Sequence, residues 1–189
     1  MAKFSLIYSW KEPPRSLQEI PYATQILYAQ GDVRLMGKRI VEVVRTREVG
    51  ERELEDARRV LEDILKDHVV VSGMAIGCEA FAYKFAIENG IWIIAVLGNP
   101  LEHPNKSPHS LKEKIRKEHL LLSQYLCGII TSLPNFINSN LTIIALSTDG
   151  LIVIKAGDKG WQFIQLGLAR YLKSQSMLLK QNFAQIFYG

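Results

Sequence analysis

The stretch that decides the fold reads Val69-Val70-Val71-Ser72-Gly73-Met74-Ala75-Ile76-Gly77-Cys78-Glu79. Its run of valines is typical of a strand buried on both faces. The Ser-Gly-x-x-x-Gly pattern then favours a sharp turn, and a helix is predicted from Glu79. Backbone N–H groups at a helix start carry partial positive charge, so such a turn can hold a phosphate. Similar turns also close many α/β layers without a ligand, and the stretch alone leaves both interpretations open.

Strand and helix patterns alternate on both sides of this stretch. An edge-like strand at 26–29 and an irregular segment at 128–138 interrupt the alternation, and Gly90 is expected to cap the helix before it in the left-handed conformation. Strand–helix–strand repeats indicate right-handed parallel crossovers. We therefore predict an α/β fold, a doubly wound, mainly parallel sheet with helices on both faces. Its strands are predicted at 40–44, 69–71, 91–97, 120–123, 150–155 and 177–179, and its helices at 51–67, 79–89, 110–118, 141–146 and 161–173.

The size and composition indicate one α/β domain. The chain has 189 residues, which we divide into an N-terminal lead-in packed on the core (1–38) and a Rossmann-like core domain (39–189). No segment approaches the length of a membrane span and no secretion signal is recognisable, so we expect a cytoplasmic protein without membrane contact. Cys78 and Cys127 are expected to be free thiols. A net charge of +4 is compatible with an anionic partner.

Five segments, in order, resemble the DNA-processing protein A family, also called DprA or Smf. Residues 20–32 are similar to the family's lead-in, a proline-containing stretch followed by Leu-Tyr and a glycine. Residues 69–79 are similar to the family's signature Val-Val-Ser-Gly-Leu-Ala-x-Gly-Ile-Asp. The family's Ile-Ala-Val-Leu-Gly, Leu-Leu-Ser-Glu-Tyr and Ile-Ile-Ala resemble residues 93–98, 120–125 and 143–145. The resemblance covers roughly residues 10 to 170. It implies an extended Rossmann fold.

The family's first loop, Gly-Ser/Thr-Arg, is assigned to Arg45-Thr46-Arg47. This register leaves a single helix between that loop and Val69, as a parallel crossover requires. The resemblance then implies single-stranded DNA binding, a homodimer, and assistance to a RecA-type recombinase during natural transformation. It implies no catalysis, and we expect no cofactor and no metal.

The candidate site lies at the carboxyl ends of the predicted strands, where open α/β sheets place their ligands. Single-strand binding requires cations for phosphates, helped by backbone donors. Strand ends and the resemblance together give these candidate DNA- or phosphate-binding residues: Arg45, Thr46, Arg47, Ser72, Gly73, Met74, Ala75, Gly77, Glu79, Gly98, Asn138, Asn140, Lys155, Lys159 and Gly160.

The sequence departs from the family pattern where binding matters. An arginine of the signature is Ile76 here, and a Phe-Pro-x-Arg-Asn-Arg segment is replaced by residues 135–142, which contain no arginine. Losing phosphate partners weakens non-specific binding. Either binding has moved to Arg45, Arg47, Lys155, Lys159 and the basic helix at 112–117, or the domain holds a nucleotide or phosphoribosyl ligand instead of DNA.

Simpler explanations compete at several of these positions. The cations of the helix at 112–117 are typical of a solvated face. His103, His109 and His119 lack the spacing of metal ligands. An enzymatic function requires a paired acid or base, and Glu79 is the candidate in the turn; a nucleotide phosphoribohydrolase is the sharpest form of that hypothesis.

Overall fold

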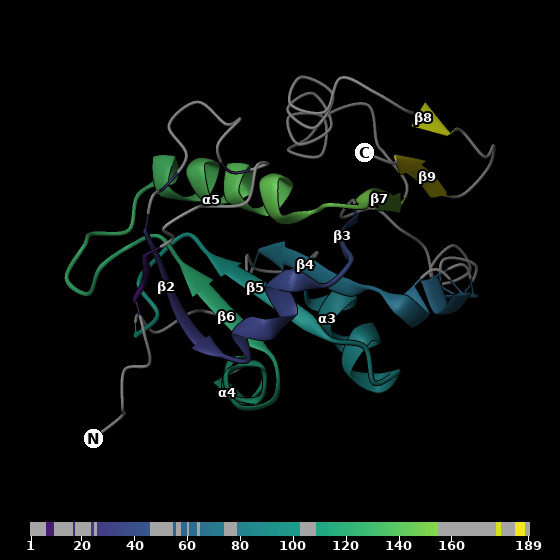
Figure 1. Cartoon of the computed structure of the whole chain (residues 1–189), viewed down its shortest axis with the longest axis horizontal. Helices are drawn as coiled ribbons and strands as arrows, with labels where there is room; N and C mark the ends of the chain where they lie inside the picture. Colours follow the sequence, from purple (N-terminus) through teal and green to yellow (C-terminus); the bar gives the residue numbers. More distant parts are fainter. Residues whose placement is uncertain are drawn as a thin grey trace.

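The computed structural model describes backbone at residues 7–9, 17, 24, 26–45, 55, 58–59, 61–63, 65–73, 79–102, 109–154, 177–178 and 184–187. Within these residues, nine strands form one sheet in the order β1-β2-β6-β5-β4-β3-β7-β9-β8 (Figure 1). The strands are β1 (Ile7–Ser9), β2 (Ile26–Gly31), β3 (Ile40–Arg45), β4 (Val69–Gly73), β5 (Ile93–Leu97), β6 (Leu120–Ser123), β7 (Gly150–Ile154), β8 (Met177–Leu178) and β9 (Ala184–Phe187).

The middle of the sheet is parallel and its flanks are antiparallel. Strands β6, β5, β4, β3 and β7 pair in parallel, whereas β2 with β1 and β9 with β8 complete the two sides with antiparallel pairs. This confirms the predicted Rossmann-like α/β fold. The prediction of an edge-like strand at 26–29 is wrong, because β2 pairs with β6 on one side and β1 on the other. The sequence pattern also missed β1 and β9.

The helices follow the predicted alternation. They are α3 (Glu79–Glu88), α4 (His109–Glu118) and α5 (Leu133–Leu146), with short 3-10 helices η1 (Val33–Gly37) and η2 (Leu65–Asp67). Helical positions at 55, 58–59 and 61–63 agree with the helix predicted at 51–67. Gly90 has φ 65°, which confirms the left-handed cap after α3. The helix predicted at 161–173 lies outside the described residues. No helix in the part described here is long and apolar enough to cross a membrane.

The helix α5 begins earlier than predicted. Residues 133–138 belong to the segment predicted to be irregular, and they contain Pro134, a residue that breaks a helix when it lies in the interior. Pro134 instead lies in the first turn, where its missing N–H has no intrahelical partner to lose, and Ser132 is the N-cap residue. The helix therefore runs through the whole of residues 135–142, the segment where the resemblance led us to expect arginines.

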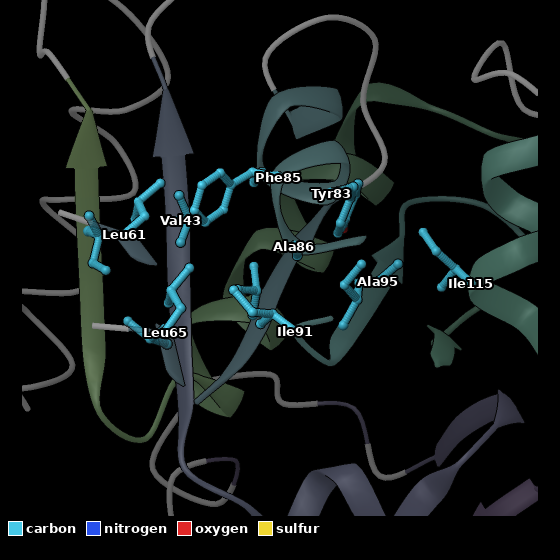
Figure 2. Close-up of a cluster of buried hydrophobic side chains, with 14 of the residues drawn as sticks. Val43, Leu61, Leu65, Tyr83, Phe85, Ala86, Ile91, Ala95 and Ile115 are labelled. Atoms are coloured by element: carbon cyan, nitrogen blue, oxygen red, sulfur yellow. The ribbon is translucent and has the colours of Figure 1, made fainter. Parts of the chain in front are cut away.

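Two hydrophobic clusters lie on opposite faces of the sheet. Side chains alternate along each strand, so β5 directs Ile93 and Ala95 into one cluster and Ile94 and Val96 into the other. The first cluster includes residues of α3 and α4, and Figure 2 shows its Tyr83, Phe85 and Ile115. The second includes residues of α5. The helices thus cover both faces, α5 on one and α3 and α4 on the other (Figure 1).

Polar contacts at the amino edge hold β7 beside β3. The backbone N–H of Asp149 donates to the Ile40 carbonyl (2.8 Å), and the Ile40 N–H donates to the Thr148 hydroxyl (3.1 Å). The Asp149 carboxylate accepts from Arg39 Nε at 2.7 Å and lies 3.3 Å from His68 Nε2. These residues precede β7, β3 and β4, so the contacts set where the three strands begin.

Candidate functional site

The candidate site is built on the reversal of strand order at β3. From β3 the chain adds β4, β5 and β6 on one side, and then returns by α5 to place β7 on the other side. At the carboxyl edge, Arg45 of β3 and Ile154 of β7 are register partners. Open α/β sheets bind their ligands at such a switch point. Arg45 occupies it by backbone position, and Lys155 follows Ile154 in the sequence.

A buried hydroxyl fixes the end of β4. Tyr83, from α3, is 1% exposed, and its hydroxyl lies 2.5 Å from the Ser72 carbonyl oxygen and 2.8 Å from that of Gly73. Since a phenol has one proton, the two carbonyls share it. The Ser72 hydroxyl is buried as well and makes a long contact (3.5 Å) with the Val43 carbonyl. Contacts with α3 and β3 thereby fix the end of β4, which directly precedes the glycine-containing stretch in the sequence.

Gly98, after β5, provides space for an aromatic ring. A Cβ at Gly98 would lie 2.4 Å from Cδ1 of Phe136, so the ring occupies the space that a side chain would need. Next to it, the Ser123 hydroxyl donates to the Asn99 carbonyl (2.7 Å) and accepts from the Tyr125 N–H (3.0 Å). The glycine at this candidate position therefore has a packing role that is visible in the structure.

Polar side chains join the loop after β6 to α5. Thr142 donates to Gln124 Oε1 (2.8 Å), and the Tyr125 hydroxyl donates to the Asn135 carbonyl (2.9 Å). Burial raises the pKa of Tyr125, while hydrogen bonds from Gln124 and with Asn138 act in the opposite direction. Asn138 is exposed and Asn140 is half-buried on the same helix. Both candidates thus lie on α5, beyond the end of β6.

The cations of α4 are engaged within their own helix. Arg116 Nε donates to Glu113 (2.9 Å), Lys117 lies 3.7 Å from the same carboxylate, and Lys114 lies 3.9 Å from Glu118. Burial lowers the pKa of Lys112, which is half-buried. Exposed pairs of this kind are worth little individually. They nevertheless lower the net positive charge that α4 offers to a phosphate chain, which favours the solvated-face interpretation.

The structure brings part of the predicted site together. Ser72 and Gly73 end β4, Gly98 follows the neighbouring β5, and Arg45 ends β3, so these four share one edge of the sheet. Glu79 is the first residue of α3. The side chains of Arg45 and Glu79 lie outside the described part, and so do all atoms of Thr46, Arg47, Met74, Ala75, Gly77, Lys155, Lys159 and Gly160.

Sequence reasoning missed two residues that contact this edge and one buried acid in β3. Tyr83 and Phe136 were not recognised as partners of the strand ends, because their contacts join segments far apart in the chain. Glu42 is fully buried in β3, three residues before Arg45. A single acidic residue within an otherwise β-branched strand was the available signal for Glu42.

Comparison with known proteins gives the family of this chain. A family model described as DNA recombination-mediator protein A matches residues 5–186. The chain belongs to this family. Curated relatives include the DNA processing protein DprA of Streptococcus pneumoniae, 32% identical over 114 residues, and the protein Smf of Synechocystis sp., 32% identical over 158 residues. These alignments cover 59% and 80% of this chain, but 40% and 39% of the relatives, so the chain spans about two fifths of their length.

Two solved structures of DNA processing protein A share the fold. The X-ray structure of the S. pneumoniae protein has a TM-score of 0.80 at 29% identity and covers 90% of this chain and 61% of its own. That of the Helicobacter pylori protein, whose title describes a single-stranded DNA binding mode, has a TM-score of 0.76 at 22% identity. It covers 88% of this chain and 77% of its own, and at this identity it shows the fold alone.

Family membership makes the composition of α5 informative. This member of the DNA recombination-mediator protein A family has no charged residue anywhere in α5. The arginine-bearing segment that the resemblance led us to expect is therefore replaced by an uncharged helix, which contributes no cation to the carboxyl edge.

Proposed function

We propose that this chain is the Rossmann-like core of a single-stranded DNA-binding recombination mediator, acting in the cytoplasm during DNA uptake. In this proposal the protein works as a homodimer, assists a RecA-type recombinase and performs no catalysis. The strand lies along the carboxyl edge of the sheet, with phosphates at the β3–β7 switch point and backbone donors from the turn after β4.

One observation carries the proposal: Arg45 ends β3 beside the end of β7, at the switch point of a sheet of this family. Thr46 and Arg47 follow Arg45 in the sequence, and Lys155 follows β7. Cations on neighbouring strand ends suit successive phosphates of a single strand. The H. pylori title supports the same ligand class, although it describes that protein.

Fluorescence anisotropy with a labelled single-stranded oligonucleotide tests the proposal. We expect binding that an unlabelled single strand competes away and that an equal amount of duplex does not. Arg45→Ala and Arg47→Ala should each weaken binding uniformly across base sequences, because phosphate contacts carry no base information. Each lost contact should also lower the slope of log K against log salt by about 0.7.

Arg34→Ala is the matched control. Arg34 is 86% exposed and lies in η1 at the opposite, amino edge of the sheet, so its removal lowers the net charge equally without touching the proposed site. Equal losses in all three variants would mean that only overall charge attracts DNA. No single-strand binding by the folded wild type, even at low salt, would contradict the proposal.

A nucleotide or phosphoribosyl ligand is the second candidate, and the uncharged α5 is the observation that favours it. The edge has fewer cations, and a ligand with one or two phosphates needs fewer of them to neutralise its negative charge than a DNA strand does. A thermal-shift panel of nucleotides separates the candidates, since a ligand that binds only the folded state raises its melting temperature. A shift with a mononucleotide and none with an oligonucleotide would favour the second candidate, and product analysis of the same mixtures would detect phosphoribohydrolase activity.

A further inference from the structure

A partly exposed aromatic ring lies at the carboxyl edge of the sheet, on the same edge as the proposed DNA site. Phe136, in the first turn of α5, is 37% exposed. Its ring lies against Gly98 and occupies the space that a Cβ there would need. The glycine therefore lets the ring pack on the backbone at the end of β5 while part of the ring stays open to solvent. An aromatic ring placed in this way can stack on a nucleobase.

The ring lies on the flank of α5 that faces β4 and β3. On the other flank, Thr142 donates to Gln124 Oε1 (2.8 Å), and Gln124 directly follows β6. At about 100° per residue, Phe136 lies about 120° around the helix from Thr142, and Asn140 lies about 160° from it. The buried Ser139 lies between the two flanks and faces the sheet. Because β5 has β6 on one side and β4 on the other, Phe136 and Asn140 share the flank toward β4 and β3.

Asn140 supplies a carboxamide next to the ring. It lies one helical turn after Phe136 and is half-buried, and within the described residues its carboxamide has no hydrogen-bond partner. The carboxamide of Gln124, by contrast, is used at both ends, since it donates to the Tyr125 hydroxyl (2.8 Å) and accepts from Thr142. A carboxamide presents a donor and an acceptor side by side, and asparagine recognises the edge of adenine through two such bonds.

The chemistry of this flank suits a base and not a phosphate. Since α5 has no charged residue, it offers no cation to a phosphate. Arg45 ends β3, two strands from β5, which is roughly 10 Å at the usual strand spacing. That span is on the scale of one nucleotide, so a phosphate at the switch point leaves its base near the ring. We propose that Phe136 and Asn140 form a nucleobase subsite, in which the base stacks on the ring and adenine is preferred because the amide pairs with its edge.

The inference rests on the proposed function, because it places the base of a strand whose phosphates lie at the switch point. It adds a base preference, which phosphate contacts do not supply. A mononucleotide presents the same base to the same subsite. The test therefore uses both a strand and a mononucleotide, so that the base subsite and the strand are measured separately.

Fluorescence anisotropy with three labelled oligonucleotides of equal length tests the base preference. The three differ at one central base in a thymine tract, which is thymine, adenine or unsubstituted purine; purine stacks like adenine but lacks the N6 amino group. The adenine strand should bind about five-fold more tightly than the thymine strand, or better. Asn140→Leu should make the adenine and purine strands equal. Phe136→Leu, which keeps an apolar side chain beside Gly98, should weaken all three strands about five-fold.

Asn89→Leu is the matched control for the loss of an amide. Asn89 is an exposed asparagine that follows α3 at the opposite, amino edge of the sheet, so its replacement should leave the adenine preference unchanged. Neither α5 variant removes a charge, so the slope of log K against log salt should stay at the wild-type value. This separates the subsite from Arg45, whose removal lowers that slope. Circular dichroism establishes that each variant is folded.

A thermal shift with adenosine 5′-monophosphate and with ribose 5-phosphate tests the same subsite without a strand. The base should add a stabilisation that ribose 5-phosphate does not give and that Asn140→Leu removes. Strand binding with equal affinity for the three bases would overturn the inference and leave the proposed function intact. No strand binding, together with an Asn140-dependent shift by the mononucleotide, would overturn the proposed function and support the inference. An Asn140→Leu protein that behaves like the wild type in both measurements would overturn the inference.

Discussion

Replacing Tyr83 by phenylalanine removes a single oxygen from the end of β4. The variant keeps the ring, which is buried in the cluster of α3 and β3, and loses only the hydroxyl that two carbonyls share. An intramolecular hydrogen bond contributes about 0.5–1.5 kcal/mol, and a buried carbonyl left short of a donor costs about 1–3 kcal/mol. We therefore expect the free energy of unfolding to fall by about 1–2 kcal/mol.

Urea unfolding followed by circular dichroism measures this loss directly. For a chain of this size, each kcal/mol corresponds to about 2–4 °C in melting temperature, so a thermal melt provides a second value. Tyr28→Phe is the control, since Tyr28 packs half-buried against the same cluster and its hydroxyl has no hydrogen bond within the described residues. It should change stability by a few tenths of a kcal/mol at most.

Two results would refute this reasoning. If Tyr83→Phe were as stable as the wild type, the hydroxyl would not hold the strand end. If Tyr28→Phe lost as much stability, the effect would belong to any tyrosine in the cluster. The same variants should also be compared in the anisotropy assay, where Tyr83→Phe is expected to bind single strands more weakly because the turn after β4 is less well fixed.

Three further predictions concern close contacts and burial. Gly31→Ala should cost several kcal/mol in urea unfolding, because Gly31 has φ 113° and its Cβ would lie 2.0 Å from the His119 carbonyl oxygen. Gly98→Ala should cost about 1–3 kcal/mol, and less in a Phe136→Ala background, which a double-mutant cycle measures. Burial lowers the pKa of His119, whose ring nitrogens have no partner within the described residues, so stability should be complete above pH 6.5 and decrease as the pH falls below it.

Each of these has a result that would contradict it. If Gly31→Ala were as stable as the wild type, the backbone at residue 31 would be able to move away from the His119 carbonyl without a measurable cost. Equal costs of Gly98→Ala with and without the Phe136 ring would remove the proposed contact. His119→Gln should flatten the pH dependence of the unfolding midpoint below pH 6.5, and an unchanged slope would assign that dependence to another group.

The sequence by itself determined most of the elements. Valine and isoleucine runs predicted β3, β4, β5 and β7, because β-branched side chains fit a strand buried on both faces. Gly90 predicted the end of α3, since its left-handed backbone suits glycine. These are local effects, and a short window of residues contains all the information needed to recognise them.

The start of α5 and the role of β2 were beyond local reasoning. Residues 133–138 combine a proline with asparagines, which disfavour helices in isolation. Packing on the sheet, which buries Asn135 and Ser139, stabilises the helix in this segment. Likewise β2 has an ordinary strand pattern, and only its partners show that it lies inside the sheet.

The candidate site was likewise predicted only in part from the sequence. The sequence determined that Arg45, Ser72 and Gly98 lie at strand ends, because a strand ends where its apolar run stops. Only the tertiary structure decided that β7 lies beside β3 and that the Tyr83 hydroxyl bonds the end of β4. It also decided that the Phe136 ring occupies the space a side chain at Gly98 would need. The reason is physical: strand order and side-chain contacts depend on which distant segments meet, and residues far apart in the chain contact one another only after the sheet has formed.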